Sequence, residues 1–255
     1  MYLIPRLRQI YETTTSQSIE NNIAKCILLN LNHIDTLSLT DISKNTAISK
    51  SAVSNFISNL SEGGGYSMFK LTLQREIKQM TFEKKVILKH AKEYEDYFIQ
   101  HGFQYVIQPQ EVKSLAKQIK NANRIAILGD LFRKGAFNML INYLLFQKKD
   151  IRYLNCLYPS DFKNECMTLN EEDLILFVEP DYTYFEFALN SEIQVDIRFK
   201  FEDCKAQKVY IGKQSTTPNE IETIAIKKTS NMFLDNEILE LLASQILYYY
   251  ILDTL

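Results

Sequence analysis

Five polar residues between positions 49 and 55 have the types and the spacing to recognise the edges of DNA bases. They are Ser49, Lys50, Ser51, Ser54 and Asn55. Hydroxyl and amide side chains donate and accept hydrogen bonds, and a lysine ammonium can contact phosphate. A short helix with such a face fits the major groove, where asparagine can pair bidentately with adenine. The pattern therefore predicts DNA binding by this segment.

The elements that must position these residues are two short helices joined by a tight turn. Ser38 and Asp41 have the spacing of a capping box, which starts the first helix. The turn is expected at residues 45–48, and Ser49 can cap the second helix. The apolar face of that second helix consists of Val53, Phe56, Ile57 and Leu60. Pairs of short amphipathic helices also occur in many proteins that do not bind DNA, where they only contribute to packing. This alternative stays open at this point.

The sequence from Ile48 to Lys70 resembles the N-terminal domain of the RpiR (MurR/RpiR) family of transcriptional regulators. The similarity lies in residues 48–56 (ISKSAVSNF), in Leu60 and in residues 65–70 (GYSMFK). Asn55 departs from the family pattern, which usually has arginine at this position. The resemblance implies a helix-turn-helix domain over residues 1–80, with double-stranded DNA as the partner.

Strand and helix patterns alternate in the rest of the chain. Apolar runs at residues 124–128 and 173–178 predict buried strands, and residues 235–252 predict a long C-terminal helix. Such alternation is typical of a parallel sheet covered by helices on both faces. We therefore expect an α + α/β fold, with an all-helical N-terminal domain and a three-layer α/β domain. The expected segments are residues 1–80, a helical connection over 81–109, and the α/β domain over 110–255.

The α/β half resembles a sugar isomerase (SIS) domain, the usual C-terminal partner of the RpiR head. A strand–glycine–loop–helix pattern at residues 125–140, followed by a second apolar strand, carries this resemblance. Aligning the two family loops places five residues at effector-binding positions. They are Gly129, Arg133, Glu179, Asp181 and Thr183. Gly129 matches the family glycine and, with a shift of one residue, Thr183 matches the family threonine, whereas Arg133, Glu179 and Asp181 stand where the family has serines.

The charges at these positions predict a modified pocket for a small-molecule effector. Glu179 and Asp181 would repel a phosphate dianion, so a sugar-phosphate effector is disfavoured. Arg133 could hold a phosphate through its guanidinium fork, or it could pair with one of the two carboxylates. We expect the internal pair, and a neutral or amine-bearing ligand is an alternative. In the simplest interpretation, residues 179–181 are a solvated loop and the domain serves only for dimerisation.

Composition excludes several other classes of protein. The chain has 255 residues, which is long enough for two domains, and its 46% apolar content is typical of globular proteins. Its net charge of −2 indicates no particular partner. Its four cysteines lack a C-x-x-C spacing and its three histidines are scattered, so we expect no metal and no cofactor. The longest apolar run, residues 246–252, is too short for a membrane span, and no signal-peptide pattern is present. We therefore expect a cytoplasmic protein that does not bind membranes.

These features together predict a transcriptional regulator with no enzyme activity. The family resemblance implies control of carbohydrate or sugar-phosphate metabolism genes. It also implies a homodimer or a dimer of dimers that pairs through the tyrosine-rich C-terminal helix, although that helix could instead be buried in its own domain. Two alternatives stay open: an SIS-domain sugar-phosphate isomerase-like enzyme with Glu179 as the base, and a non-catalytic dimeric assembly protein.

Overall fold

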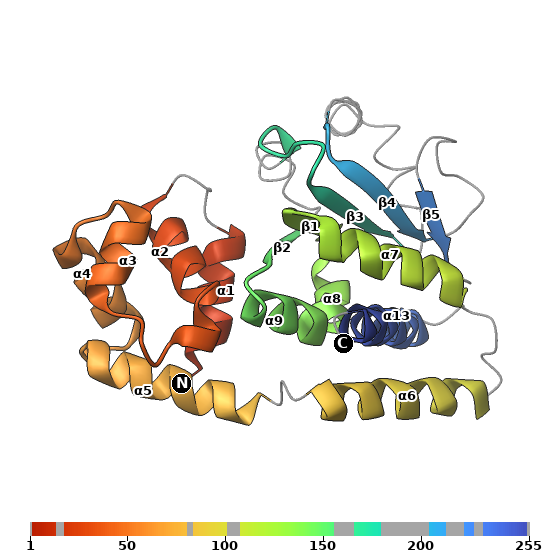
Figure 1. The fold of residues 1–255 in the computed structure, drawn as a ribbon, viewed down its shortest axis with the longest axis horizontal. Helices are drawn as coiled ribbons and strands as arrows, with labels where there is room; N and C mark the ends of the chain where they lie inside the picture. The colour runs from red at the N-terminus through yellow and green to blue at the C-terminus, as the bar shows by residue number, and fades with distance from the viewer. Residues whose placement is uncertain are drawn as a thin grey trace. The chain divides into compact units, whose positions relative to one another are not determined.

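The computed structural model divides the chain into two compact units (Figure 1). The first unit comprises residues 1–82 and 143–150, and the second comprises residues 83–142 and 151–255. The structure describes residues 2–13, 18–80, 84–100, 108–155, 166–179, 204–212, 222–226 and 232–253.

The first unit is helical. Its elements are α1 (Leu3–Thr13), α2 (Ile19–Leu28), the 3-10 helix η1 (Leu31–His33), α3 (Leu39–Thr46), α4 (Lys50–Leu60) and α5 (Tyr66–Gln79). Helix α1 packs against α2 and α5. The sequence prediction missed α1, although Leu3, Leu7 and Tyr11 recur every four residues and all three are buried. The spacing of apolar residues also predicts helices at residues 19–31 and 68–80, and α2 and α5 occur there, within a few residues at their ends.

The second unit is built on a five-stranded sheet with the strand order β2-β1-β3-β4-β5. The strands are β1 (Arg124–Gly129), β2 (Asp150–Asn155), β3 (Leu174–Glu179), β4 (Gln207–Gly212) and β5 (Glu222–Ala225). The pairings of β1 with β3, β3 with β4 and β4 with β5 are parallel. Side chains on both faces of β1 are buried, as expected for a strand that is covered on both sides. The structure therefore confirms the predicted α + α/β fold class.

The helices of the second unit include one long C-terminal helix. They are α6 (Lys84–Gln100), α7 (Pro109–Asn121), α8 (Leu131–Lys134), the 3-10 helix η2 (Gly135–Phe137), α9 (Asn138–Phe146) and α13 (Met232–Leu252). Figure 1 shows α13 running beside α7 and α6, and its residues contact α6, α7, α8 and η2. The predicted helix at residues 182–190 and the predicted strand at residues 195–199 lie outside the described residues.

Burial along α13 decides between the two interpretations of its apolar surface. Leu242, Ile246 and Ile251 are fully buried within the single chain, and Tyr250 is nearly so. Packing against α6 and α7 of the same chain thus buries these side chains without a second subunit. This agrees with the alternative that the C-terminal helix is buried in its own domain. The predicted dimer stays a prediction. Among the described residues, no helix combines the length and the hydropathy needed to span a bilayer.

Candidate nucleic-acid interface

The helix pair of the candidate interface begins at a complete capping box. The Ser38 hydroxyl accepts a hydrogen bond from the Asp41 backbone N–H at 3.2 Å. In return, the Asp41 carboxylate accepts from the Ser38 backbone N–H at 3.0 Å. Hydrogen bonds from the Ser38 side chain and backbone lower the pKa of the Asp41 carboxyl. The predicted start of α3 is therefore confirmed.

The turn between α3 and α4 depends on one residue with left-handed backbone geometry. Ala47 has φ 56° and ψ 27°. The Ile48 N–H donates to the Ser43 carbonyl at 3.2 Å, and the Ser43 hydroxyl donates to the Ile48 carbonyl at 2.6 Å. The Ala47 N–H also donates to the Lys44 carbonyl at 3.4 Å, so the two backbone bonds satisfy carbonyls in the last turn of α3, as in a Schellman cap. Because alanine has a Cβ, this conformation is strained in a way that glycine would not be.

Helix α4 presents all five predicted DNA-binding residues to solvent. Ser49, Lys50, Ser51, Ser54 and Asn55 are exposed. The Ser49 hydroxyl caps the helix by accepting from the Ala52 N–H at 3.3 Å. On the opposite face, Val53, Ile57 and Leu60 are 0%, 1% and 4% exposed, so the orientation of the helix is fixed. Phe56, the fourth residue of the predicted apolar face, is only half-buried. The structure therefore places the five residues on one helix, from its N-cap at Ser49 to its middle at Asn55, whereas their contact with DNA stays a prediction.

Three long-range hydrogen bonds, which the sequence analysis missed, hold this helix pair in place. The Arg6 guanidinium of α1 donates to the Leu60 carbonyl at the end of α4, at 2.9 Å. The Tyr66 hydroxyl of α5 donates to the Leu37 carbonyl at 2.5 Å, just before α3. The Lys70 ammonium donates to the Asp35 carbonyl at 2.5 Å. Helices α1 and α5 are therefore the scaffold that sets the position of α3 and α4.

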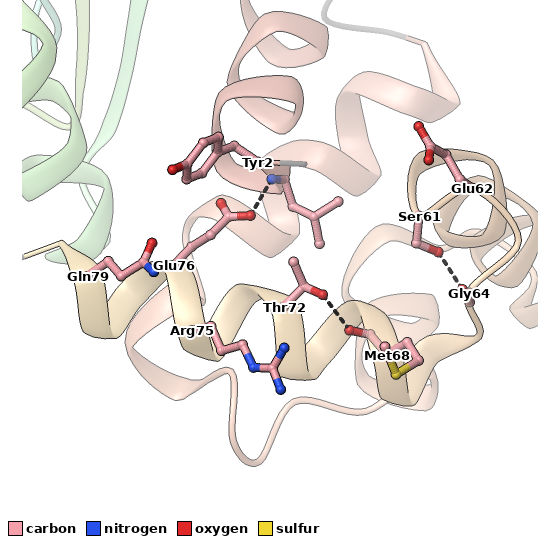
Figure 2. Close-up of a pocket in the computed structure, with 10 residues that line it drawn as sticks. Tyr2, Ser61, Glu62, Gly64, Met68, Thr72, Arg75, Glu76 and Gln79 are labelled. Atoms are coloured by element: carbon pink, nitrogen blue, oxygen red, sulfur yellow. Dashed lines mark hydrogen bonds between the residues drawn. The ribbon is translucent and has the colours of Figure 1, made fainter.

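The start of α1 is capped by a carboxylate from α5. Glu76, which is 5% exposed, accepts from the backbone N–H groups of Leu3 at 2.5 Å and Ile4 at 2.8 Å. The first N–H groups of a helix lack partners within the helix and favour a negative charge. Figure 2 shows Glu76 beside the start of α1, in the wall of an open hollow of about 510 Å³. Sequence spacing gives no signal for this contact, because its partners are more than seventy positions apart.

The loop after β1, where the effector site is predicted, is crowded by an aromatic side chain. The Tyr153 hydroxyl donates to the Asp130 carbonyl at 2.6 Å. A Cβ on Gly129 would lie 2.4 Å from that hydroxyl oxygen, which is closer than real Cβ contacts occur. Glycine at position 129 is therefore required by the packing of Tyr153. This gives the position a structural reason that does not involve a ligand.

Arg133 has a local partner that the sequence analysis did not consider. Asp130 caps α8 by accepting from the Arg133 N–H at 3.0 Å, and its carboxylate forms an ion pair with the Arg133 guanidinium. Arg133 is thus neutralised from within its own loop. Glu179 is the last residue of β3, where its backbone pairs with Gly212. Its side chain lies outside the described residues, as do Asp181 and Thr183, so their role in the pocket stays a prediction.

Asp173, the residue just before β3, has a structural role. It is 1% exposed and accepts from the Arg124 guanidinium at 2.6 Å. It also accepts from the backbone N–H groups of Arg124 at 3.1 Å and Asn170 at 2.9 Å. A buried carboxylate with these partners is satisfied and ties the start of β1 to the start of β3. Within the described part of the chain, no group of three metal-ligating side chains occurs.

Comparisons with known proteins find similarity only at the level of solved structures. No family model matches the sequence, and no curated protein matches it. The NanR protein of Vibrio vulnificus, complexed with ManNAc-6P, is 16% identical over 99% of this chain and 92% of that chain, with a TM-score of 0.45. The C-terminal domain of glucosamine-fructose-6-phosphate aminotransferase from Francisella tularensis is 8% identical over 83% of this chain and 53% of that chain, with a TM-score of 0.43. A protein described as a sugar-phosphate isomerase from Listeria monocytogenes is 11% identical over 72% of this chain and 91% of that chain, with a TM-score of 0.39. These identities and scores assign no family to the chain.

Proposed function

We propose that the chain is a DNA-binding transcriptional regulator of RpiR type that reads its operator with α4. The observation that carries this proposal is the division of α4 into two faces. Three of its apolar side chains, Val53, Ile57 and Leu60, are buried, and Phe56 is half-buried. The exposed hydrogen-bonding side chains are Ser49 at the N-cap and Lys50, Ser51, Ser54 and Asn55. A helix that only packed the unit together would need no such concentration of serine, lysine and asparagine on its exposed face.

The exposed residues divide naturally between bases and phosphates. Asn55 has the amide needed for bidentate pairing with adenine, and Ser51 and Ser54 can donate to or accept from base edges. Lys50 lies at the first position of α4 and can neutralise one phosphate. A single lysine on this face implies a modest electrostatic contribution. Specific binding would then depend mainly on base contacts and on the pairing of two heads in a dimer.

The second unit is proposed to regulate the head through a modified effector pocket. Arg133 is paired with Asp130, and Tyr153 occupies the space over Gly129. In the described part of this loop, the guanidinium that could hold a phosphate is paired with a carboxylate, and Tyr153 blocks the close approach of a ligand to Gly129. We therefore propose a regulator of carbohydrate or sugar-phosphate metabolism genes whose effector is not a simple sugar phosphate, and no enzyme activity. The proposed protein is cytoplasmic and acts as a homodimer or a dimer of dimers on a palindromic site.

The test is a binding titration of the purified chain on double-stranded fragments from upstream of its own gene, across a salt series. Asn55→Ala should weaken specific binding by about tenfold to a hundredfold, the range expected when one bidentate pair of hydrogen bonds to a base is removed. Lys50→Ala should lower the slope of log K against log salt by about 0.9 for each phosphate that the protein no longer neutralises. Matched controls are Asn121→Ala and Lys85→Ala, which replace exposed residues of α7 and α6.

Two outcomes separate this proposal from its competitors. If both α4 variants lose affinity while both controls bind like the wild type, α4 is the reading helix. If the wild-type chain shows no salt-dependent binding to any upstream fragment at low salt, the proposal fails. The chain would then fit the non-catalytic assembly protein better.

A further inference from the structure

Two cysteines from separate segments of the second unit meet in its buried core. Cys166 precedes β3 and Cys204 precedes β4, and they are 2% and 4% exposed. Both belong to one apolar cluster that also contains Leu169, Phe177 and Tyr210. Their side chains are joined by a hydrogen bond, and both are free thiols. Contact between two thiols from distant parts of a chain is the geometry from which a disulfide can form.

The groups around Cys204 favour its ionised form. The Cys166 thiol and the Ala206 backbone N–H are hydrogen-bonded to Cys204, and the Lys208 ammonium adds a favourable charge. Lys208 also donates to the Cys204 carbonyl at 2.6 Å, which holds it nearby. Burial and the negative charge of Asp173 oppose these effects, and the balance lowers the pKa of Cys204 to about 7. The thiolate, and not the thiol, is the reactive form of cysteine.

We propose that Cys166 and Cys204 form a peroxide-sensitive pair that closes into an intramolecular disulfide. The Cys204 thiolate attacks one oxygen of hydrogen peroxide, the O–O bond breaks, and Cys204 becomes a sulfenic acid as the other oxygen leaves as water after protonation. The Cys166 sulfur then attacks the Cys204 sulfur, forms the S–S bond and displaces the sulfenic oxygen as a second water. Two thiols are oxidised by two electrons, and one peroxide is reduced to two waters.

The pair is separate from the predicted effector residues. Cys166 and Cys204 lie before the amino ends of β3 and β4, whereas Gly129 ends β1 at the opposite edge of the parallel sheet. The disulfide would close residues 166–204, which include β3, into a covalent loop, and such a loop restricts the unfolded state. Oxidation should therefore raise the thermal midpoint of the second unit by several degrees. The inference does not depend on the proposed function, since it needs no DNA and no effector.

The experiment is peroxide treatment of the full-length folded chain, followed by blocking of free thiols, non-reducing proteolysis and mass spectrometry. The expected product is a peptide that links Cys166 to Cys204. Cys26 is an internal control, because burial raises the pKa of its thiol. Formation of the disulfide should increase with pH and reach half of its maximal rate near pH 7. The same treatment in urea should abolish the preference for this pairing.

Two variants assign the roles of the cysteines. Cys166→Ser should leave a sulfenic acid at Cys204 that dimedone traps, and Cys204→Ser should leave Cys166 without that label. The unmodified chain keeps the test decisive even if a variant misfolds. The inference is overturned if both thiols survive treatment that oxidises Cys26. It is also overturned if the disulfide that forms joins either residue to Cys26 or Cys156.

Discussion

Removing the carboxylate of Glu76 should detach the start of α1 from α5. In Glu76→Ala, the Leu3 and Ile4 N–H groups lose their acceptor, and each hydrogen bond to a charged group is worth about 1.5–3 kcal/mol. Because the hollow beside Glu76 is open, water can hydrogen-bond to the two N–H groups and compensate for part of the lost free energy. Two such bonds would be worth about 3–6 kcal/mol; because water compensates in part, we expect α1 to lose about 2–3 kcal/mol of local stability, at or below the lower end of that range. Glu76→Gln keeps one acceptor and should lose about half as much.

Hydrogen exchange read by mass spectrometry is the suitable assay, since it reports each helix separately. A loss of about 2–3 kcal/mol corresponds to exchange of α1 amides about 30- to 150-fold faster. Amides of α13 and β1 should exchange at the wild-type rate. The matched control is Gln79→Ala, because Gln79 is exposed and lines the same hollow without capping α1.

The outcome also bears on the position of α4. Arg6 of α1 donates a hydrogen bond to the last carbonyl of α4, so fraying of α1 should loosen the position of α4. We therefore expect Glu76→Ala to weaken DNA binding by a few-fold. Wild-type exchange of α1 in Glu76→Ala would refute the reasoning, because the two N–H groups would then have another acceptor. Equal acceleration in Gln79→Ala would do so as well, since the effect would belong to the hollow and not to the carboxylate.

Three further predictions follow from local geometry. Ala47→Gly should raise the stability of the first unit by about 0.5–1 kcal/mol in a thermal melt, because glycine adopts φ 56° without strain; no gain would argue against strain there. Gly129→Ala should cost about 1–3 kcal/mol by crowding the Tyr153 hydroxyl, and Tyr153→Phe in the same chain should recover part of that loss. The lowered pKa of Asp41 means that its stabilisation is present above its ordinary pKa and is lost as pH falls through the folded pKa. A pH series of melts should therefore show a smaller acid loss in Ser38→Ala than in the wild type.

The candidate interface could be predicted from sequence because its signals are local. A capping box, an N-cap and the period of a helix all connect residues within four positions of each other. The structure confirms the Ser38–Asp41 box, the Ser49 cap and the buried back of α4. Apolar strands were also predictable, because a run such as residues 174–178 is buried on both faces wherever it lies in the sheet.

The loop after β1 shows how aligned positions can hide a local signal. Alignment with the family loops predicts that Arg133 pairs with Glu179 or Asp181, which are far away in the chain. The partner that the structure shows is Asp130, only three residues earlier, where it also caps α8. An aspartate at an N-cap with arginine three positions later is a pattern that sequence reasoning could have used.

The remaining features were decided by tertiary structure alone. The carboxylate of Glu76 at the start of α1, Tyr153 over Gly129 and the contact of Cys166 with Cys204 all join residues that are distant in the chain. Sequence by itself determined the caps, the polar face of α4 and the order of strands and helices, because one or two turns of chain encode them. Folding decided which side chains meet across elements, because that depends on how the whole backbone packs.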